Sequence, residues 1–425
     1  MQTRKQGLFV AFALWTFVLG VVLGSAVLVI ATVPVAMYLV FIMLGSQPHL
    51  DVSLERILPE GQVYEGERAT VLLRVRNEGP RVDLEIADEV PQGIDVVAGS
   101  SHIFAVLDRG ESRDFGYTLL PRVFGTYAFG PIRLRASDQA ASRYEAKTSQ
   151  SFGSLRVYPE VKYLNRIELR HTRPRNWPGE TPTRRAGQGT EYYGIREYIP
   201  GDSLRRVNWK ASARFGRLML NQYMNEAGGE TVVVLDFRSG SMVGTPPDTT
   251  LAYSVRAAAA LSYRLLRDRN RVGLLGVGRK LTKVPPGFGR RQFERILAGL
   301  ITTEASEDDW SIDLFPYYIS LYYSRMVQVV LVSPLIDYRP IYLISEMVRK
   351  GYDVLVMSPS PVELDEPRRG ESRTLKLARE LALMDRNQKL ASLRKHARVV
   401  DWNPRLPLQD AMEELRESWR ARKPV

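Results

Sequence analysis

Residues that can bind charged groups are concentrated in one run, residues 187–216, which reads GQGTEYYGIREYIPGDSLRRVNWKASARFG. Residues 184–217 hold eight basic and three acidic side chains. Arginine pairs bidentately with carboxylate or phosphate groups. Charges that are partly buried beside aromatic rings persist only when they are paired. The run therefore predicts one interlocked polar network, which either binds an anion or an acidic partner or braces a neighbouring sheet. We expect the bracing role.

The same run resembles the signature of the prokaryotic domain of unknown function 58 (DUF 58) family. The resemblance implies a membrane-anchored protein with a von Willebrand factor type A-like domain and a MoxR-type AAA+ ATPase as its partner. The matching residues that we take as the candidate interaction site are Gly187, Gly189, Glu191, Arg196, Glu197, Tyr198, Pro200, Gly201, Asp202, Arg205, Arg206, Asn208, Trp209, Lys210 and Arg214.

The local chemistry of the signature predicts a turn followed by a helix. Pro200-Gly201 suits a type II turn, because proline presets φ and glycine accepts a positive φ. Asp202 or Ser203 can then cap a helix that starts at Leu204. Gly216 is expected to end that helix.

The type A resemblance also implies a metal-ion-dependent adhesion site, whose Asp-x-Ser-x-Ser oxygen ligands suit Mg²⁺. The matching stretch is residues 236–241, DFRSGS, in which the serines fall one residue late. The candidate ligands are Asp236, Ser239, Ser241 and Asp337, with Ser333 in the later family pattern and Thr245, Thr249 and Thr250 as further hydroxyl donors. A local bulge could restore the site; otherwise the charge of Arg238 could replace the cation. We expect a degenerate site and no cofactor.

The remaining residues do not predict an enzyme. The chain has no cysteine, which excludes disulfides, thiolate catalysis and cysteine-based metal sites. The four histidines, at positions 49, 102, 171 and 396, are not at metal-ligand spacing. No nucleic-acid motif is present, so we do not expect nucleic-acid binding.

The overall charge is strongly positive, at +12 with a pI near 9.7. Of the 59 basic residues, 48 are arginine. This excess is compatible with intramolecular ion pairs, and also with attraction to an anionic membrane surface or an acidic partner.

Residues 6–50 contain no charged side chain, and this run predicts two membrane spans near residues 8–23 and 27–44. A turn at Gly24-Ser25 would join them. A cleaved signal peptide is the alternative, but the run is too long for one. Arg4 and Lys5 favour a cytoplasmic N-terminus. We therefore expect a two-span protein of the cell membrane that contacts the lipid bilayer, with its soluble domains in the cytoplasm.

The rest of the chain predicts two soluble domains. Residues 47–160 alternate apolar and polar side chains between turn signals, which favours an all-β immunoglobulin-like sandwich. Residues 231–425 alternate strands and helices, with a long helix pattern at residues 251–269, which favours a doubly wound α/β domain with a parallel sheet. The order of these elements resembles a von Willebrand factor type A domain. We expect the domains to be a hairpin at 1–46, the β domain at 47–160, the signature and linker at 161–230, and the α/β domain at 231–425.

Together these features predict a membrane-anchored, non-enzymatic scaffold that works with a MoxR-type ATPase in assembling or maturing other proteins. Two other functions stay open at this point. One is an enzyme, or an accessory subunit, of cell-envelope polymer metabolism. The other is a metal-dependent adhesion receptor, which would require an intact Asp236 site.

Overall fold

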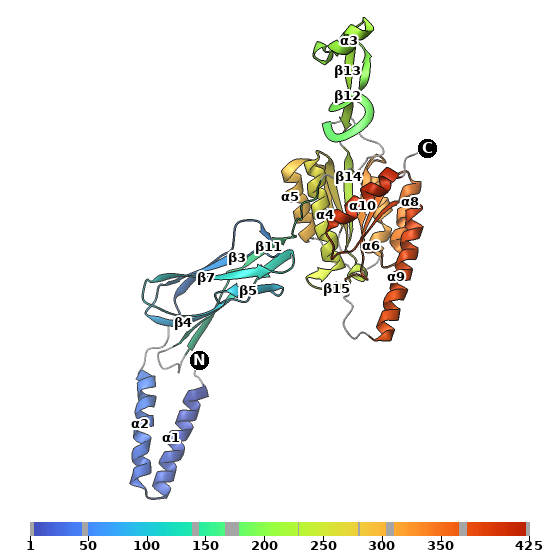
Figure 1. The fold of residues 1–425 in the computed structure, drawn as a ribbon. Helices are drawn as coiled ribbons and strands as arrows, with labels where there is room; N and C mark the ends of the chain where they lie inside the picture. Colours follow the sequence, from blue (N-terminus) through green and yellow to red (C-terminus); the bar gives the residue numbers. More distant parts are fainter. Residues whose placement is uncertain are drawn as a thin grey trace. The chain divides into compact units, whose positions relative to one another are not determined.

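The computed structural model describes residues 4–44, 50–137, 144–165, 178–227, 229–278, 281–302, 310–364 and 372–421 (Figure 1). The chain divides into two compact units, Met1–Val157 and Tyr158–Val425. Each unit is described by itself below.

Unit 1 begins with two helices, α1 (Arg4–Val22) and α2 (Ala26–Leu44), which lie side by side. The turn between them contains Gly24, whose φ of 63° is left-handed. The position of this turn was predicted from the sequence. A side chain at Gly20 would collide with Val29, so glycine lets the two helices approach closely here.

The predicted membrane spans are wrong. The uncharged run is divided between two helices of 19 residues each. Over the part of the chain that the structure describes, no helix has both the length and the apolarity needed to cross a bilayer. This finding overturns the first element of the predicted fold class. It also overturns the predicted location as a two-span protein of the cell membrane.

The remainder of unit 1 is built from strands. They are β1 (Val52–Ile57), β2 (Val63–Tyr64), β3 (Ala69–Asn77), β4 (Val82–Ala87), β5 (Ile94–Ala98), β6 (His102–Leu107), β7 (Ser112–Pro121), β8 (Gly125–Phe129), β9 (Ile132–Ser137), β10 (Tyr144–Ser149) and β11 (Gly153–Tyr158), whose last residue lies at the boundary. Two antiparallel sheets have the orders β1-β3-β7-β5 and β10-β9-β4-β6, and a smaller one has the order β2-β11-β8.

The two larger sheets of unit 1 share one apolar core. Buried and exposed residues alternate strictly along β3, as the period of a half-buried strand requires. Leu73 of β3 and Leu119 of β7 meet Ile86 of β4 and Leu134 of β9 in the same cluster. The predicted alternation therefore did identify the residues that face inward.

Unit 2 is organised around one six-stranded sheet of order β18-β17-β14-β19-β20-β21. Its strands are β14 (Glu230–Asp236), β17 (Arg271–Val277), β18 (Thr282–Gly287), β19 (Gln328–Val332), β20 (Asp353–Pro359) and β21 (Arg398–Trp402). Strands β17, β14, β19, β20 and β21 are parallel to one another, whereas the edge strand β18 pairs antiparallel with β17. The sheet is therefore mixed, whereas the sequence had predicted a parallel one.

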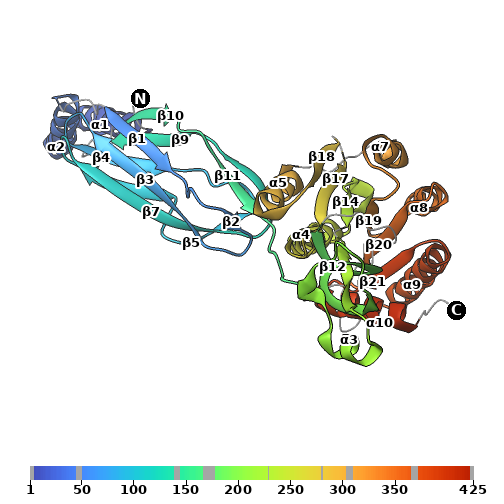
Figure 2. The ribbon, with the colours of Figure 1, turned by 90° about the horizontal axis from the view of Figure 1, so that it is seen from above.

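Helices cover both faces of this sheet (Figure 2). They are α4 (Thr250–Arg267), α5 (Gly289–Thr302), α6 (Trp310–Asp313), α7 (Phe315–Tyr322), α8 (Arg339–Arg349), α9 (Arg373–Arg394) and α10 (Leu408–Ala421), with short pieces η2 (Ser239–Ser241), β15 (Gly244–Thr245) and β16 (Asp248–Thr249) before α4. Helices α4 and α5 contact each other and the strands on one face. On the other face, Val232 and Val234 of β14 share a core with residues of α7, α8 and α9.

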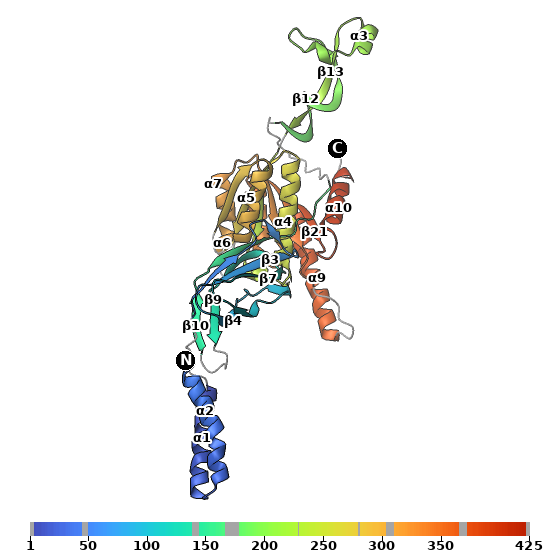
Figure 3. The same cartoon turned by 90° about the vertical axis from the view of Figure 1, so that its left-hand side faces the viewer.

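A two-stranded antiparallel ribbon precedes β14 in the chain (Figure 3). It consists of β12 (Pro178–Glu197) and β13 (Met219–Ala227), with the 3-10 helix η1 (Leu204–Arg206) and the helix α3 (Trp209–Phe215) between them. The ribbon and the two short helices between its strands contain the signature run, residues 187–216.

Candidate functional site

The signature run folds into a small structure at the end of the β12–β13 ribbon, which we call the signature tip (residues 192–220). Strands β12 and β13 pair through Arg196 with Leu220 and through Glu197 with Met219. Val207, Ala211, Met219 and Leu220 are buried and form the interior of the tip. Gly187 and Gly189, which were also predicted to belong to the site, lie in β12, and the side chain of the predicted Glu191 lies outside the described residues.

A bidentate ion pair holds the turn of the tip. Arg196 Nη1 and Nη2 donate to the two carboxylate oxygens of Asp202 at 2.6 and 2.7 Å. The backbone N–H of Ile199 also donates to Asp202, at 3.0 Å. The hydrogen bond from Arg196, followed by that from Ile199, lowers the pKa of the Asp202 carboxyl below its ordinary value. Gly201 has a φ of 105°, as the predicted turn requires.

The helix of the tip starts later than predicted. Residues 204–206 form only the short η1, and Ser203 makes no capping hydrogen bond there. Helix α3 begins at Trp209, where Asn208 Oδ1 accepts the N–H of Ala211 at 2.9 Å. Asn208 Nδ2 also donates to Asn221 at 2.8 Å, which attaches the start of the helix to β13. Gly216, with a φ of 68°, ends α3 as predicted.

Several large apolar side chains of the tip are exposed, contrary to the expected bracing role. Trp209 is 68% exposed, Leu204 62% and Phe215 57%, and Ile199 is exposed as well. A buried tryptophan would have tied the signature to a neighbouring sheet. Exposed side chains of this size are instead available for contact with a partner.

The basic residues of the tip outnumber its acids. Residues 192–219 contain six basic and two acidic side chains. Both acids are already engaged, because Asp202 pairs with Arg196 and Glu197 pairs with Arg217 at 3.1 Å. The other basic residues are Arg205, Lys210 and Arg214, which are exposed, and Arg206, which is half-buried. The tip therefore combines exposed aromatic area with excess positive charge.

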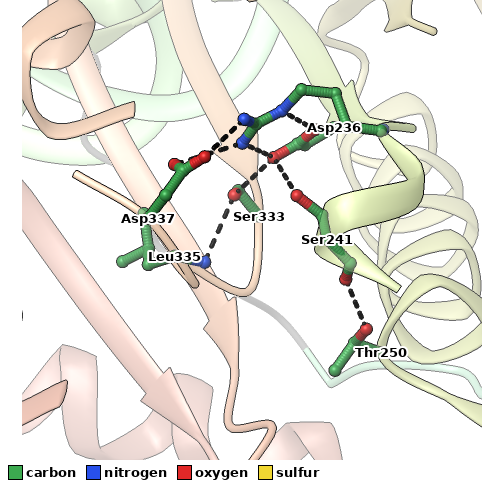
Figure 4. Close-up of polar contacts among 7 residues, drawn as sticks. Asp236, Ser241, Thr250, Ser333, Leu335 and Asp337 are labelled. Carbon is green, nitrogen blue, oxygen red and sulfur yellow. Dashed lines mark hydrogen bonds and ion pairs between the residues drawn. The ribbon is translucent and has the colours of Figure 1, made fainter. Parts of the chain in front are cut away.

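A second polar cluster lies at the carboxyl end of the parallel strands (Figure 4). Asp236 ends β14, and its side chain is fully buried. Arg238 Nε and Nη2 donate to the two carboxylate oxygens of Asp236, both at 2.9 Å. Arg238 Nη1 donates to Asp337 Oδ2 at 2.6 Å, and Asp337 lies in the loop after β19. The guanidinium group thus bridges two carboxylates.

Hydroxyl groups complete this second cluster. Ser241 Oγ and Ser333 Oγ each donate to Asp236 Oδ2 at 2.9 Å. Thr250 Oγ1 donates to the carbonyl oxygen of Ser241 at 2.6 Å, which joins the start of α4 to the same cluster. The structure therefore brings together Asp236, Ser241 and Asp337 of the predicted metal ligands, whereas Ser239 uses its backbone carbonyl to accept an N–H at the end of η2.

Electrostatics at Arg238 favour the charged form. Burial opposes the positive charge, but the hydrogen bonds and negative charges of Asp236 and Asp337 outweigh it and raise the pKa of the guanidinium. Within the described part of the chain, no group of three or more histidine, aspartate or glutamate side chains is arranged to hold a metal ion.

Sequence reasoning missed the residues that hold the loop after β19 from the side of α9. Arg386 of α9 donates to the carbonyl oxygen of Pro334 at 3.0 Å and pairs with Asp401. Lys389 donates to the carbonyl oxygen of Ile336. Both side chains are buried, although the sequence around them looks like an ordinary charged helix surface. No local motif distinguishes them.

Comparison with known proteins gives a family match for the region that contains most of the signature tip and the polar cluster around Asp236. Residues 194–396 match the family model described as Protein of unknown function DUF58. This match confirms the resemblance that the signature predicted. The type A-like domain and the ATPase association remain predictions.

The relatives of the chain are distant. It is 22% identical to Uncharacterized protein YeaD of Bacillus subtilis (strain 168) over 275 residues, which cover 63% of this chain and 66% of that one. It is 32% identical to Uncharacterized protein Rv1480 of Mycobacterium tuberculosis (strain ATCC 25618 / H37Rv) over 117 residues, or 27% of this chain and 37% of that one. The chain thus spans less than two thirds of the length of these curated relatives.

Among solved structures, a FixG-related protein from Vibrio parahaemolyticus aligns with a TM-score of 0.19 and 12% identity, covering 26% of this chain and 98% of that one. A non-cellulosomal cohesin from the archaeon Archaeoglobus fulgidus aligns with a TM-score of 0.19 and 12% identity, covering 25% and 91%. Similarities at this level carry no argument about fold or function.

Proposed function

We propose that this chain is a non-enzymatic interaction protein whose signature tip binds a MoxR-type AAA+ ATPase, and that the two proteins act together in the assembly or maturation of other proteins. We further propose that the α/β region is a von Willebrand factor type A-like domain. Its support is the doubly wound order of the sheet, in which the chain starts at β14 and extends to β17 on one side and β19 on the other.

The observation that carries the proposal is the exposure of Trp209, together with Leu204 and Phe215, on the signature tip. Tryptophan and arginine are the residues most often found at the energetic centres of protein interfaces. Exposing a tryptophan in a family signature brings no stability through packing, so its role is better explained by contact with another molecule.

The charge of the tip specifies the chemistry of the partner surface. Arg205, Lys210 and Arg214 are exposed on the same tip, and its two acids already have basic partners. Complementary charges accelerate association and select the correct partner. We therefore expect the ATPase to present an apolar pocket with an acidic rim.

Binding of the purified full-length chain to a MoxR-type ATPase from the same source would test this proposal. Trp209→Ala is expected to weaken binding by at least about 30-fold, since interface hot spots contribute about 2 kcal/mol or more. Arg205→Ala is expected to slow association and to reduce its sensitivity to salt.

Tyr342→Ala is the matched control, because Tyr342 is an equally exposed aromatic residue on α8. It should leave the affinity unchanged. Failure of the wild-type chain to bind the ATPase, or equal effects of the Trp209 and Tyr342 substitutions, would contradict the proposal.

A further inference from the structure

The cluster around Asp236 has the composition of a cation site. Asp236 ends β14 and Asp337 lies in the loop after the neighbouring parallel strand β19, and the two carboxylates converge with the hydroxyls of Ser241 and Ser333. Carboxylate and hydroxyl oxygens are the ligands that Mg²⁺ accepts. The same edge of a doubly wound sheet is where such folds bind ligands.

The positions of the hydrogen-bond donors do not fit a metal ion. Both oxygens of Asp236 accept from Arg238 at 2.9 Å, and both oxygens of Asp337 lie within 3.4 Å of it. Asp236 Oδ2 accepts three hydrogen bonds, from Arg238 Nη2 and from the hydroxyls of Ser241 and Ser333, and is therefore already occupied by donors. A divalent ion placed here would lie a few ångströms from a guanidinium charge and would be repelled.

We infer that the guanidinium group of Arg238 replaces the divalent cation between Asp236 and Asp337, so that this edge of the sheet needs no metal ion. The side chain of Arg238 is only 2% exposed and reaches both carboxylates at once. A cation that belongs to the chain cannot dissociate, and the loops after β14 and β19 are therefore connected at every metal concentration. This inference does not depend on the proposed partner.

The spacing of residues 236–241 allows a metal site to be restored by mutation. Arg238→Ser combined with Gly240→Ser turns residues 236–240 into Asp-x-Ser-x-Ser. Gly240 tolerates a side chain, since a Cβ there would meet nothing within 4 Å and its φ is not in the left-handed range. The double variant removes the guanidinium and adds the two hydroxyls that the shifted serines fail to supply.

The experiment compares the full-length wild type with this double variant in titrations with Mn²⁺ and Mg²⁺. We expect the wild type to bind neither ion more tightly than about 1 mM and to have the same melting temperature in EDTA. The double variant should bind Mn²⁺. Saturation at about 100 times the Kd should raise its melting temperature by at least about 5 °C.

Two controls make the result specific. Asp236→Asn in the double variant should abolish the gained binding, and Arg238→Lys alone should remain insensitive to metal because it keeps a cation in place. A double variant that folds only when Mn²⁺ is present would also support the inference.

Three outcomes would overturn it. One is Asp236-dependent metal binding by the wild type. Another is a double variant that is folded but does not bind metal. The third is a double variant that stays unfolded with and without Mn²⁺, because the guanidinium would then be needed for more than its charge.

Discussion

Arginine has two different roles in this chain, and burial separates them. Arg238 is buried between Asp236 and Asp337, where its charge is matched by carboxylates. Arg205 is exposed on the signature tip. The same residue type is therefore structural in one place and available to a partner in the other, which no count of basic residues reveals.

Removal of the buried guanidinium should be costly. Arg238→Ala leaves the fully buried Asp236 without its counter-charge, and we expect unfolding of the α/β unit to become about 3–5 kcal/mol more favourable. Chemical denaturation followed by circular dichroism would measure this change.

Arg74→Ala is the matched control for that experiment. Arg74 also makes two hydrogen bonds to one aspartate, Asp114, but both side chains are about half exposed. Exposed pairs contribute about 0–1 kcal/mol. Equal losses from the two substitutions would show that burial of Arg238 does not determine its contribution.

The ion pair in the turn of the tip should be sensitive to acid. Hydrogen bonding to Arg196 lowers the pKa of Asp202 below its ordinary value of 3.8. The carboxylate therefore favours the folded turn above that pH, and its contribution is lost as the pH falls through the lower, folded-state pKa. Carbon-13 NMR of the aspartate carboxyl groups, with Asp202→Asn to assign the signal, should show a midpoint below 3.8.

The test of this mechanism is Arg196→Ala. Without the guanidinium, the midpoint of Asp202 should move back toward 3.8, although the N–H of Ile199 still donates to the carboxylate. An unchanged midpoint would assign the lowered pKa to the backbone of the turn alone.

At the scale of single elements, the short α3 depends on polar contacts rather than on its own length. A helix of seven residues is not stable by itself. Asn208 caps it and contacts β13, and Ser212 Oγ accepts the N–H of Met219 at 2.8 Å. These contacts fix the position of Trp209 at the start of the helix, which leaves its ring outward.

Asn208→Ala should loosen α3. Loss of the capping side chain costs about 1–2 kcal/mol, so local opening should become about 5–30 times more frequent. Tryptic cleavage after Lys210 and Arg214 should accelerate by the same factor when cleavage follows the opened state.

Ser203→Ala is the control, because Ser203 precedes η1 without making a capping bond. We expect it to leave the cleavage rate unchanged. Equal acceleration by both substitutions would mean that Asn208 does not act as a cap.

Arginine and lysine residues also hold the loop after β19 from two sides. Arg238 contacts it at Asp337, whereas Arg386 and Lys389 of α9 contact the carbonyl oxygens of Pro334 and Ile336. Leu335, between these carbonyls, has a left-handed φ of 56°. Such a conformation is unfavourable for leucine and persists only where the surroundings enforce it.

At the scale of the whole molecule, the chain has two units with separate apolar cores. Leu84 lies in the core of unit 1 and Leu331 in the core of unit 2, and each is 2% exposed. Truncation of a buried leucine to alanine costs about 2–5 kcal/mol. We expect each substitution to destabilise only its own unit.

Hydrogen exchange with mass spectrometry would test this at the level of peptides. Leu84→Ala should accelerate exchange in residues 52–157, and Leu331→Ala in residues 230–402, with each variant serving as the control for the other. Acceleration in both units by either substitution would show that the two cores unfold together.

The amino-acid sequence by itself determined the local features of this protein. Period-2 alternation predicted the inward residues of β3 and β4, and the helix predicted at residues 251–269 is α4, Thr250–Arg267. The signature residues predicted the family match, the turn at Gly201 and the end of α3 at Gly216. These features follow from side-chain periodicity and backbone dihedral preferences, which act over a few residues.

Only the tertiary structure decided how distant residues meet and which side chains are buried. It placed Arg238 between Asp236 and Asp337, which lies 99 residues beyond Arg238 in the chain, and left Trp209 exposed although the signature was expected to brace a neighbouring sheet. It also showed that, over the described residues, neither of the two N-terminal helices qualifies as a membrane span. Burial and long-range ion pairing depend on the whole arrangement of elements, and a local pattern of residue types does not contain that information.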